Sequence, residues 1–225
     1  MNDTKSPKTV IIISGGTVSY IRPHFAVCAP AYGTVGNDIH REFWTQDFHM
    51  HKDDLTLINA QTKMAYKGSG IETTEDLSNY IDHIMEDKKV AAIVMAAAVC
   101  DFHAESISSM KCTDVSWEIG KEYERLKSNE KIAVGLVPSE KIVRKIKDNR
   151  PDIHLTTFKT VTNKTNSEML EIGFGSMNAI RSDVTLINDI ALRKNGILTK
   201  SGSITFYDHR HEAVSRIVKE VLKNI

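Results

Sequence analysis

The residues with the clearest chemical potential follow a short apolar run near the start of the chain. Val10 to Ile13 are four consecutive β-branched residues, typical of a strand buried on both faces, and Ser14-Gly15-Gly16-Thr17 follows directly. Glycines permit a sharp turn and a close approach of backbone N–H groups to a ligand. Because ligands of open α/β sheets bind beyond the carboxyl ends of the strands, Gly15, Gly16 and Thr17 predict a nucleotide or phosphate site. The alternative is an ordinary tight turn after a buried strand.

A second group of candidate residues lies near the middle of the chain. Residues 90–99 are apolar and rich in alanine, and we expect a central strand that ends near Met95. The small side chains either allow tight packing or leave room for a base or ribose. Asp101 follows and can accept a hydrogen bond from a ligand hydroxyl group or cap a turn. Lys111 lies in a polar stretch, where a lysine is usually a solvated charge.

The composition excludes several classes of function. The 225 residues carry 29 basic and 29 acidic side chains, so the net charge of zero gives no sign of a surface for nucleic acids. No segment approaches the roughly 20 apolar residues that a membrane span needs. The N-terminal segment also lacks the apolar core of a signal peptide. We therefore expect a cytoplasmic protein without nucleic-acid or membrane partners.

The cysteines and histidines do not form a metal-binding pattern. The three cysteines are scattered along the chain, which is typical of a reduced compartment. Two pairs of histidines are spaced two residues apart, namely His49 with His51 and His209 with His211. Neither pair has a carboxylate or thiolate that would converge on it, so we expect no metal-binding side chains here.

Alternating strands and helices position these residues. Strands are expected at 10–13, 54–59, 90–95, 131–137, 153–157 and 183–188, and helices at 37–48, 73–87, 139–148, 167–181 and 212–222. Residues 21–36 contain two prolines and are expected to be irregular, and residues 103–128 are expected to be a surface loop with some extended structure. Residues 196–207 predict a β-hairpin. The pattern predicts one domain over residues 1–225, a doubly wound, mostly parallel α/β sheet with a late β-hairpin insertion.

Four motifs occur in an order that resembles phosphopantothenate–cysteine ligases, most closely the stand-alone bacterial form. They are Ser-Gly-Gly-Thr at 14–17, Ala-Ala-Ala-Val-Cys-Asp-Phe at 96–102, Phe158-Lys159 and Ile187-Asn188-Asp189. The resemblance covers nearly the whole chain and implies a Rossmann-like fold and a homodimer. It implies that CTP, or ATP as in eukaryotic relatives, activates the carboxylate of 4′-phosphopantothenate with the help of Mg²⁺. The amine of cysteine then attacks the acyl-nucleotide.

The resemblance also implies roles for individual residues. Met95, Ala96 and Ala97 match the backbone that holds the cytosine nucleotide, and Asp101 matches a nucleotide-binding aspartate. Lys111 has the offset of a lysine that contacts the triphosphate and supports catalysis. The stretch from Ser139 to Val143 resembles a helix start that meets the triphosphate. Phe158 matches an aromatic residue beside the nucleotide, with ordinary core packing as the alternative.

The chain departs from the family pattern on the side of the acid substrate. The family asparagine that holds the acyl-nucleotide falls on Ala29, although Gly33 and Gly36 keep the two glycines of that loop. An aspartate and an arginine that commonly flank the loop are replaced by Arg22 and Phe25. Two lysines of the late helix, which meet the phosphates in the fused bacterial enzyme, have no clear counterpart here.

These departures leave three hypotheses open. The chain is a divergent phosphopantothenate–cysteine ligase, a nucleotide-dependent ligase for another acid, or a non-catalytic nucleotide-binding homologue. Fold and family alone do not decide between them, because function depends on the site.

Overall fold

A central sheet of seven strands organises the chain in the computed structural model, which describes residues 7–46, 54–111, 115–129 and 131–225. The strands are β1 (Lys8–Gly16), β4 (Leu55–Gln61), β5 (Val90–Ala98), β9 (His154–Val161), β10 (Val184–Asp189), β11 (Lys194–Thr199) and β12 (Ile204–Tyr207). Their order is β12-β11-β10-β9-β5-β1-β4. The five strands from β4 to β10 are parallel, and β11 and β12 form the antiparallel hairpin. This arrangement confirms the predicted mostly parallel sheet with a late hairpin.

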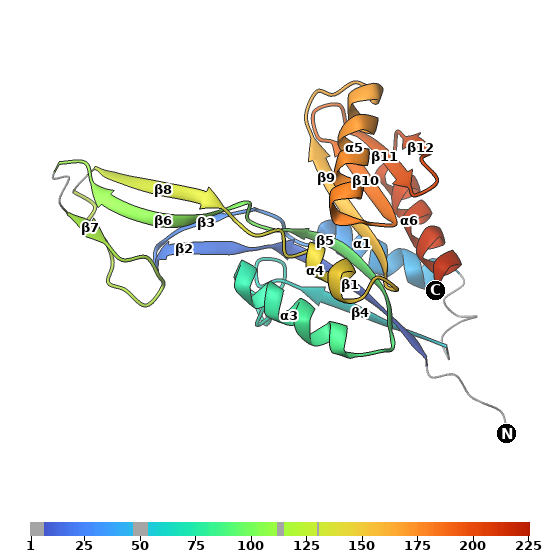
Figure 1. Cartoon of the computed structure of the whole chain (residues 1–225), viewed down its shortest axis with the longest axis horizontal. Helices are drawn as coiled ribbons and strands as arrows, with labels where there is room; N and C mark the ends of the chain where they lie inside the picture. Colours follow the sequence, from blue (N-terminus) through green and yellow to red (C-terminus); the bar gives the residue numbers. More distant parts are fainter. Residues whose placement is uncertain (1–6, 47–53, 112–114, 130) are drawn as a thin grey trace.

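Helices cover both faces of this sheet (Figure 1). The helices are α1 (Thr34–Thr45), α3 (Thr74–Glu86), α4 (Arg144–Asn149), α5 (Asn166–Ile180) and α6 (Arg210–Asn224). Helices α1 and α6 pack on one face, and α3 and α4 pack on the other. Helix α5 also lies on the second face, where Gly173 brings it against the side chain of Ile187. The fold is therefore doubly wound, as the alternation of elements predicted.

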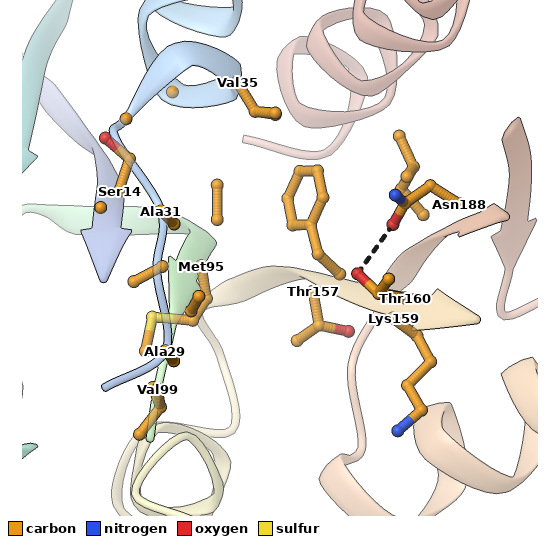
Figure 2. A pocket seen from close by; sticks show the side chains of 18 of the residues that line it. Ser14, Ala29, Ala31, Val35, Met95, Val99, Thr157, Lys159, Thr160 and Asn188 are labelled. Carbon is orange, nitrogen blue, oxygen red and sulfur yellow. Dashed lines mark hydrogen bonds between the residues drawn. The ribbon is translucent and has the colours of Figure 1, made fainter. Parts of the chain in front are cut away.

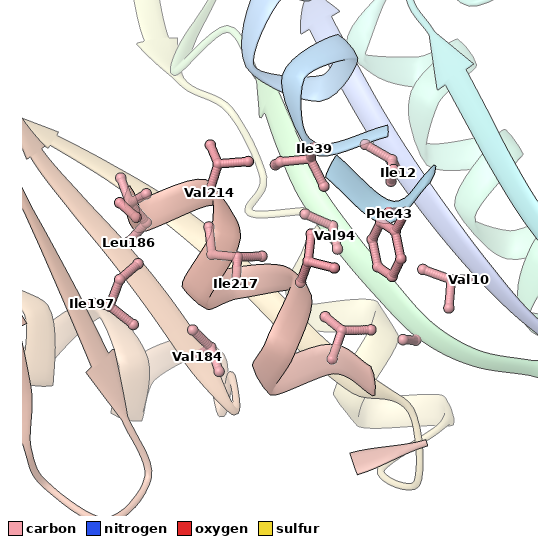
Figure 3. Close-up of a cluster of buried hydrophobic side chains, with 14 of the residues drawn as sticks. Val10, Ile12, Ile39, Phe43, Val94, Val184, Leu186, Ile197, Val214 and Ile217 are labelled. Atoms are coloured by element: carbon pink, nitrogen blue, oxygen red, sulfur yellow. The ribbon is translucent and has the colours of Figure 1, made fainter. Parts of the chain in front are cut away.

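The apolar residues of β1 explain why the sheet needs helices on both faces. Val10 and Ile12 are fully buried on the face of α1 and α6, where they join Phe43 and Ile217 (Figure 3). Ile11 and Ile13 are buried on the opposite face. Successive side chains of a strand alternate between faces, so a continuous apolar run requires two apolar layers.

Five further strands form an arm that extends away from the central sheet (Figure 1). They are β2 (Val18–Arg22), β3 (Phe25–Cys28), β6 (Phe102–Ser109), β7 (Ser116–Trp117) and β8 (Ile132–Pro138). Strands β2 and β3 form one small sheet, and β7, β6 and β8 form another. Ile21, Ala104 and Ile107 are the buried centre of the arm.

The arm and the segment after it correct three predictions. Residues 21–36 were expected to be irregular, but Pro23 lies in the turn between β2 and β3, where a proline breaks no strand. Residues 103–128 were expected to be a surface loop with some extended structure, and the extended part is larger than expected, because it includes most of β6 and all of β7. The helix expected over 139–148 begins only at Arg144, because a turn occupies the residues before it.

The start of α3 agrees with the sequence prediction. Thr73 is the N-cap residue, and its side chain accepts a hydrogen bond from the Asp76 N–H group at 3.0 Å. The Asp76 carboxylate accepts in return from the Thr73 N–H group at 2.8 Å. This capping box fixes the start of the helix.

Candidate active site

A cavity of about 730 Å³ opens at the carboxyl ends of β1, β5, β9 and β10. Residues 29–36, which form the loop after β3 and the first turn of α1, supply one wall (Figure 2). The ends of β9 and β10, together with α5 and α6, supply the opposite wall. The volume is within the range of small-molecule and cofactor sites, and the position is the usual one in open α/β sheets.

Glycines shape the first wall by allowing chain segments to approach closely. Gly15, Gly33 and Gly36 line the cavity, and Gly15 and Gly33 have φ values of 100° and 75°. A methyl group at Gly36 would overlap the side chain of Ser14. Gly16 does not line the cavity, and its missing side chain instead makes room for the carbonyl oxygen of Ala29.

The N-terminus of α1 faces the cavity without a neutralising group. Gly33 is the N-cap residue and offers no side-chain hydrogen bond, and the first turn contains no acidic residue. Residues 33–36 line the cavity, so the positive end of the helix dipole and its N–H groups are directed to it. Ser14 adds a hydroxyl group that is 1% exposed and has no hydrogen-bond partner among the described residues. These groups together favour an anionic ligand.

The end of β5 contributes three of the predicted residues. Met95, Ala96 and Ala97 line the cavity, and the strand continues to Ala98 instead of ending near Met95. Asp101 also lines the cavity, and its carboxylate forms an ion pair with Lys141.

The ends of β9 and β10 contribute an aromatic ring, an amide and a lysine. Phe158 and Lys159 line the cavity beside Asn188. The Thr160 hydroxyl donates a hydrogen bond of 3.1 Å to Asn188 Oδ1 (Figure 2). That bond leaves the amide nitrogen of Asn188 as a donor for a ligand.

Asp189 fixes the chain immediately after Asn188. Its carboxylate accepts hydrogen bonds from the N–H groups of Lys164 at 2.7 Å, Ala191 at 3.0 Å and Leu192 at 2.9 Å. Burial acts to raise the pKa of Asp189, but these backbone donors outweigh it and hold the pKa below its usual value. The Asp189 carboxylate therefore positions the end of β10.

Besides Gly16, three predicted site residues lie outside the cavity. Thr17 is fully buried, and its hydroxyl group accepts a hydrogen bond from the Cys100 N–H group at 2.8 Å. Ser139 lines a separate cavity of about 560 Å³. Lys111 follows the far end of β6, about 30 Å from Asp101 if the intervening residues are counted as extended strand. In its own chain, Lys111 is thus remote from the ligand that it was expected to contact.

Lys141 and Val143, which belong to the predicted stretch from Ser139 to Val143, do line the cavity. Lys159, Asn188 and Arg210 also line it and were not assigned a role from the sequence. Lys159 and Asn188 were present in the motifs that carried the family resemblance, which was the available signal. Helix α5 contributes Ser176 and Ile180 to the lining. The α5 residues from Asn166 to Ile180 include no lysine.

Residues 7–46, 54–111, 115–129 and 131–225 contain no group of three or more His, Cys, Asp or Glu side chains arranged to hold a metal ion. None of the helices in that part of the chain has the length and apolar character needed to cross a membrane. His49 and His51 lie outside the described residues, and the rings of His209 and His211 stack at 5.6 Å.

Comparison with known proteins places the chain in a family. The family model for the DNA/pantothenate metabolism flavoprotein C-terminal domain matches residues 6–224. The coenzyme A biosynthesis bifunctional protein CoaBC of Thermococcus kodakarensis is 23% identical over 186 residues, which are 81% of this chain and 41% of that protein. The chain spans about half the length of the curated relatives that it matches.

Solved structures show the same fold. The DNA/pantothenate metabolism flavoprotein of Streptococcus pneumoniae has a TM-score of 0.79 and 18% identity, and the match covers 96% of this chain and 99% of that one. A Cab2 mutant in complex with phosphopantothenate-cysteine has a TM-score of 0.59 and 15% identity, over 96% of this chain and 85% of that one. Because the family model spans nearly the whole sequence, the chain belongs to the DNA/pantothenate metabolism flavoprotein C-terminal domain family, as its resemblance to phosphopantothenate–cysteine ligases predicted.

Proposed function

We propose that the chain is a nucleotide-dependent ligase that joins 4′-phosphopantothenate to cysteine in coenzyme A biosynthesis. The observation that carries this proposal is the cavity at the carboxyl ends of the parallel strands, which combines the uncapped N-terminus of α1 with lysine side chains. Family membership and the names of the relatives support the substrates. A triphosphate matches the chemistry of the cavity, because anions bind favourably at helix N-termini and beside ammonium groups.

The proposed reaction has two steps. In the first step, a carboxylate oxygen of 4′-phosphopantothenate attacks the α-phosphorus of CTP or ATP, and pyrophosphate leaves. In the second step, the cysteine amine attacks the acyl carbon, the bond to the nucleotidyl oxygen breaks, and the nucleoside monophosphate leaves while the amine loses a proton to solvent. We propose Mg²⁺ as the counter-ion of the triphosphate, bound mainly through phosphate oxygens and water.

The nucleotide contacts follow from the cavity lining. We propose that Gly15 and the residues from Met95 to Ala97 hold the base and ribose through the backbone. The ring of Phe158 covers an apolar face of the nucleotide, and Asp101 accepts a hydrogen bond from it. The N–H groups of residues 34–36 and the buried Ser14 hydroxyl donate to phosphate oxygens. The phosphate thereby takes the place of the side-chain cap that α1 lacks, and it gives the Ser14 hydroxyl the partner that it lacks in the described part of the chain.

We propose that Lys111 acts in the cavity of a second copy of the chain. The arm extends Lys111 away from its own cavity, and it exposes the apolar side chains of Phe102 (48%) and Leu136 (44%). We propose a homodimer in which the arm of one copy brings Lys111 to the cavity of the other.

Mixing an inactive Lys111→Ala variant with an inactive Gly36→Val variant should then restore part of the activity, because mixed dimers contain one complete site. Unchanged inactivity of the mixture, with dimers present by sedimentation, would contradict this placement.

Ala29 favours a second candidate function, amide formation on another acid. Ala29 lines the cavity at the position of the family asparagine, and its methyl side chain cannot hydrogen-bond to the acyl-nucleotide. Losing one such transition-state contact typically lowers turnover by about 10²–10³-fold. A non-catalytic nucleotide-binding role is the third candidate.

Product formation distinguishes these candidates. The purified chain is incubated with CTP or ATP, Mg²⁺, cysteine and 4′-phosphopantothenate, and both pyrophosphate and the amide product are measured. We expect both products, and we expect Ala29→Asn to increase their rate. Pyrophosphate release only with a different acid would favour the second candidate. Nucleotide binding without turnover on any acid would favour the third.

A further inference from the structure

We infer that Lys159 holds the phosphate chain of the nucleotide, in a position where α5 offers no positive charge. This inference rests on the proposed nucleotide site and adds a binding residue to it. Lys159 follows Phe158 near the end of β9 and pairs with Ile187 of β10, while the pairing of β9 with β5 ends two residues earlier, at Thr157. A strand in the centre of a sheet is a rigid support, which suits a residue that must meet a ligand in one place.

Two lysines that line the cavity, Lys159 and Lys141, differ in whether they have an ion-pair partner. Lys141 forms an ion pair with Asp101, so the local charge of that pair is zero. Lys159 is exposed, and no hydrogen bond or ion pair to it is found in the described part of the chain. An ammonium group that lines a cavity without a carboxylate attracts an anion, because a phosphate oxygen can replace water as its hydrogen-bond acceptor.

The direction of the Lys159 side chain places it on a different side of the sheet from Phe158. Neighbouring residues of a strand point to opposite faces. Phe158 packs toward the cluster under α1 and α6, so Lys159 is directed to the face that carries α4 and α5. Figure 2 shows the Lys159 side chain extending away from Asn188. On the same face, α5 contributes only Ser176 and Ile180 to the cavity lining.

This geometry orients the nucleotide. The base beside Phe158 and the first-turn N–H groups of α1 lie on the α6 face, and Lys159 lies on the α5 face. The phosphate chain must therefore cross the end of β9, so that its inner part meets the N–H groups of α1 and its outer part meets Lys159. Arg210, at the start of α6, lies on the face of the base. We therefore expect removal of the Lys159 charge to weaken the binding of CTP more than that of CMP. Removal of the Arg210 charge should change the affinities for these nucleotides by more similar factors.

The test compares CMP, CDP and CTP by isothermal titration calorimetry with Mg²⁺ present, and ATP is titrated into the wild-type chain in the same way. Lys159→Gln should weaken CTP binding by about 10- to 100-fold, the usual range for a hydrogen bond between charged groups, and should leave CMP binding nearly unchanged. Lys159→Arg should retain most of the CTP affinity. Lys219→Gln is the matched control, because Lys219 is an exposed lysine that does not line the cavity. Melting curves establish that each variant is folded.

The outcomes separate this inference from the proposed function. If the wild-type chain binds CTP and Lys159→Gln binds it equally well, the assignment of Lys159 is wrong and the nucleotide site stands. Equal weakening of CMP and CTP would also contradict a role at the phosphate chain. If the wild-type chain binds neither CTP nor ATP, the proposed function and the assignment of Lys159 are both wrong.

Discussion

Charged and polar groups have different partners at the two ends of the parallel strands. We call the end where these strands begin the amino edge of the sheet and the end where they stop the carboxyl edge. At the amino edge, the ammonium group of Lys147 lies 2.6 Å from the Asp183 carboxylate, and the Lys147 side chain is only 5% exposed. The Asp183 carboxylate also accepts from the Leu155 N–H group at 2.8 Å. The buried guanidinium group of Arg150 donates to three backbone carbonyl oxygens, those of Met85, Asp87 and Val90. Each of these buried ions has partners that compensate for its lost hydration.

The carboxyl edge leaves comparable groups without partners among the described residues. The Ser14 hydroxyl is buried and unbonded, α1 begins without a side-chain cap, and Lys159 forms no ion pair. Buried polar groups are normally hydrogen-bonded. Other buried groups without a partner occur among the described residues, Arg22 and His154 for example, but Ser14 is the one of them that lines the cavity. Its hydroxyl beside an uncapped helix start fits an absent anionic ligand. The amino edge thus carries buried ions that pair within the chain, and the carboxyl edge carries the groups that remain available to a ligand. Substitutions at the two edges should therefore have separable effects.

The largest effect on stability is expected at the amino edge. Asp183→Asn leaves the buried Lys147 ammonium group without its carboxylate, and breaking such a pair typically costs about 3–5 kcal/mol of the free energy of unfolding. Urea unfolding measures this loss. Asp82→Asn is the matched control, because its 2.9 Å pair with Lys145 is more exposed, at 48% and 29% of the two side chains, and such a pair should contribute about 0–1 kcal/mol. Equal losses for the two variants would contradict the difference between buried and exposed pairs.

The same pair gives the unfolding free energy a pH dependence. Burial acts to raise the pKa of Asp183, but the Leu155 N–H group and the ammonium groups of Lys147 and Lys200 outweigh it and lower the pKa. A lowered pKa in the folded state means that the contribution is complete above the unfolded-state value of about 4 and is lost as the pH falls through the folded-state value. Wild-type stability should therefore decline below about pH 4 more steeply than that of Asp183→Asn. Parallel pH profiles would show that Asp183 contributes none of this dependence.

A smaller loss of stability is expected from a methyl group at the carboxyl edge. Gly36→Ala would force Ser14 and the first turn of α1 apart, and such overpacking typically costs about 1–3 kcal/mol. The displaced helix start should also weaken CTP binding. The double variant Ser14→Gly with Gly36→Ala removes the overlap and should recover much of the lost stability. No recovery, measured by urea unfolding, would mean that the overlap with Ser14 is not the cause.

The smallest effect is expected from a residue that only positions Asn188. Thr160→Val removes the hydroxyl group that donates to Asn188 Oδ1, and one hydrogen bond of this kind contributes about 0.5–1.5 kcal/mol. CTP affinity should fall about 2- to 10-fold, while the melting temperature stays unchanged because the bond is exposed. A lower melting temperature with unchanged CTP affinity would show that this bond stabilises the fold and does not position Asn188 for the nucleotide.

The sequence predicted the central sheet well because its strands are buried. The β-branched run from Val10 to Ile13 and the apolar residues 90–99 are continuous enough to indicate strands covered on both faces. The arm was not predicted because its strands bury few residues. In β6, for example, only Ala104, Ile107 and Ser109 are buried, among polar neighbours. Periodicity carries little signal in a strand of that composition.

The cavity lining was predicted only in part, because motifs report local sequence and some lining residues are distinguished only by tertiary contacts. Motif matching identified the glycines, the alanines and Phe158, whose positions depend on local sequence. Lys111 was selected by its distance along the chain from Asp101, but β6 is extended and carries it away from the cavity. Lys159 was passed over because its distinguishing property is the lack of a partner, and the ion pair between Lys141 and Asp101 is a tertiary contact.

The most direct test of the central claim is a crystal structure of the chain with CTP and Mg²⁺. The triphosphate should lie across the ends of β1, β5 and β9, with phosphate oxygens within hydrogen-bond distance of the first-turn N–H groups of α1 and of the Lys159 ammonium group. The base should lie beside Phe158. A nucleotide bound elsewhere on the folded chain, with this cavity holding only solvent, would contradict the proposed function and the assignment of Lys159.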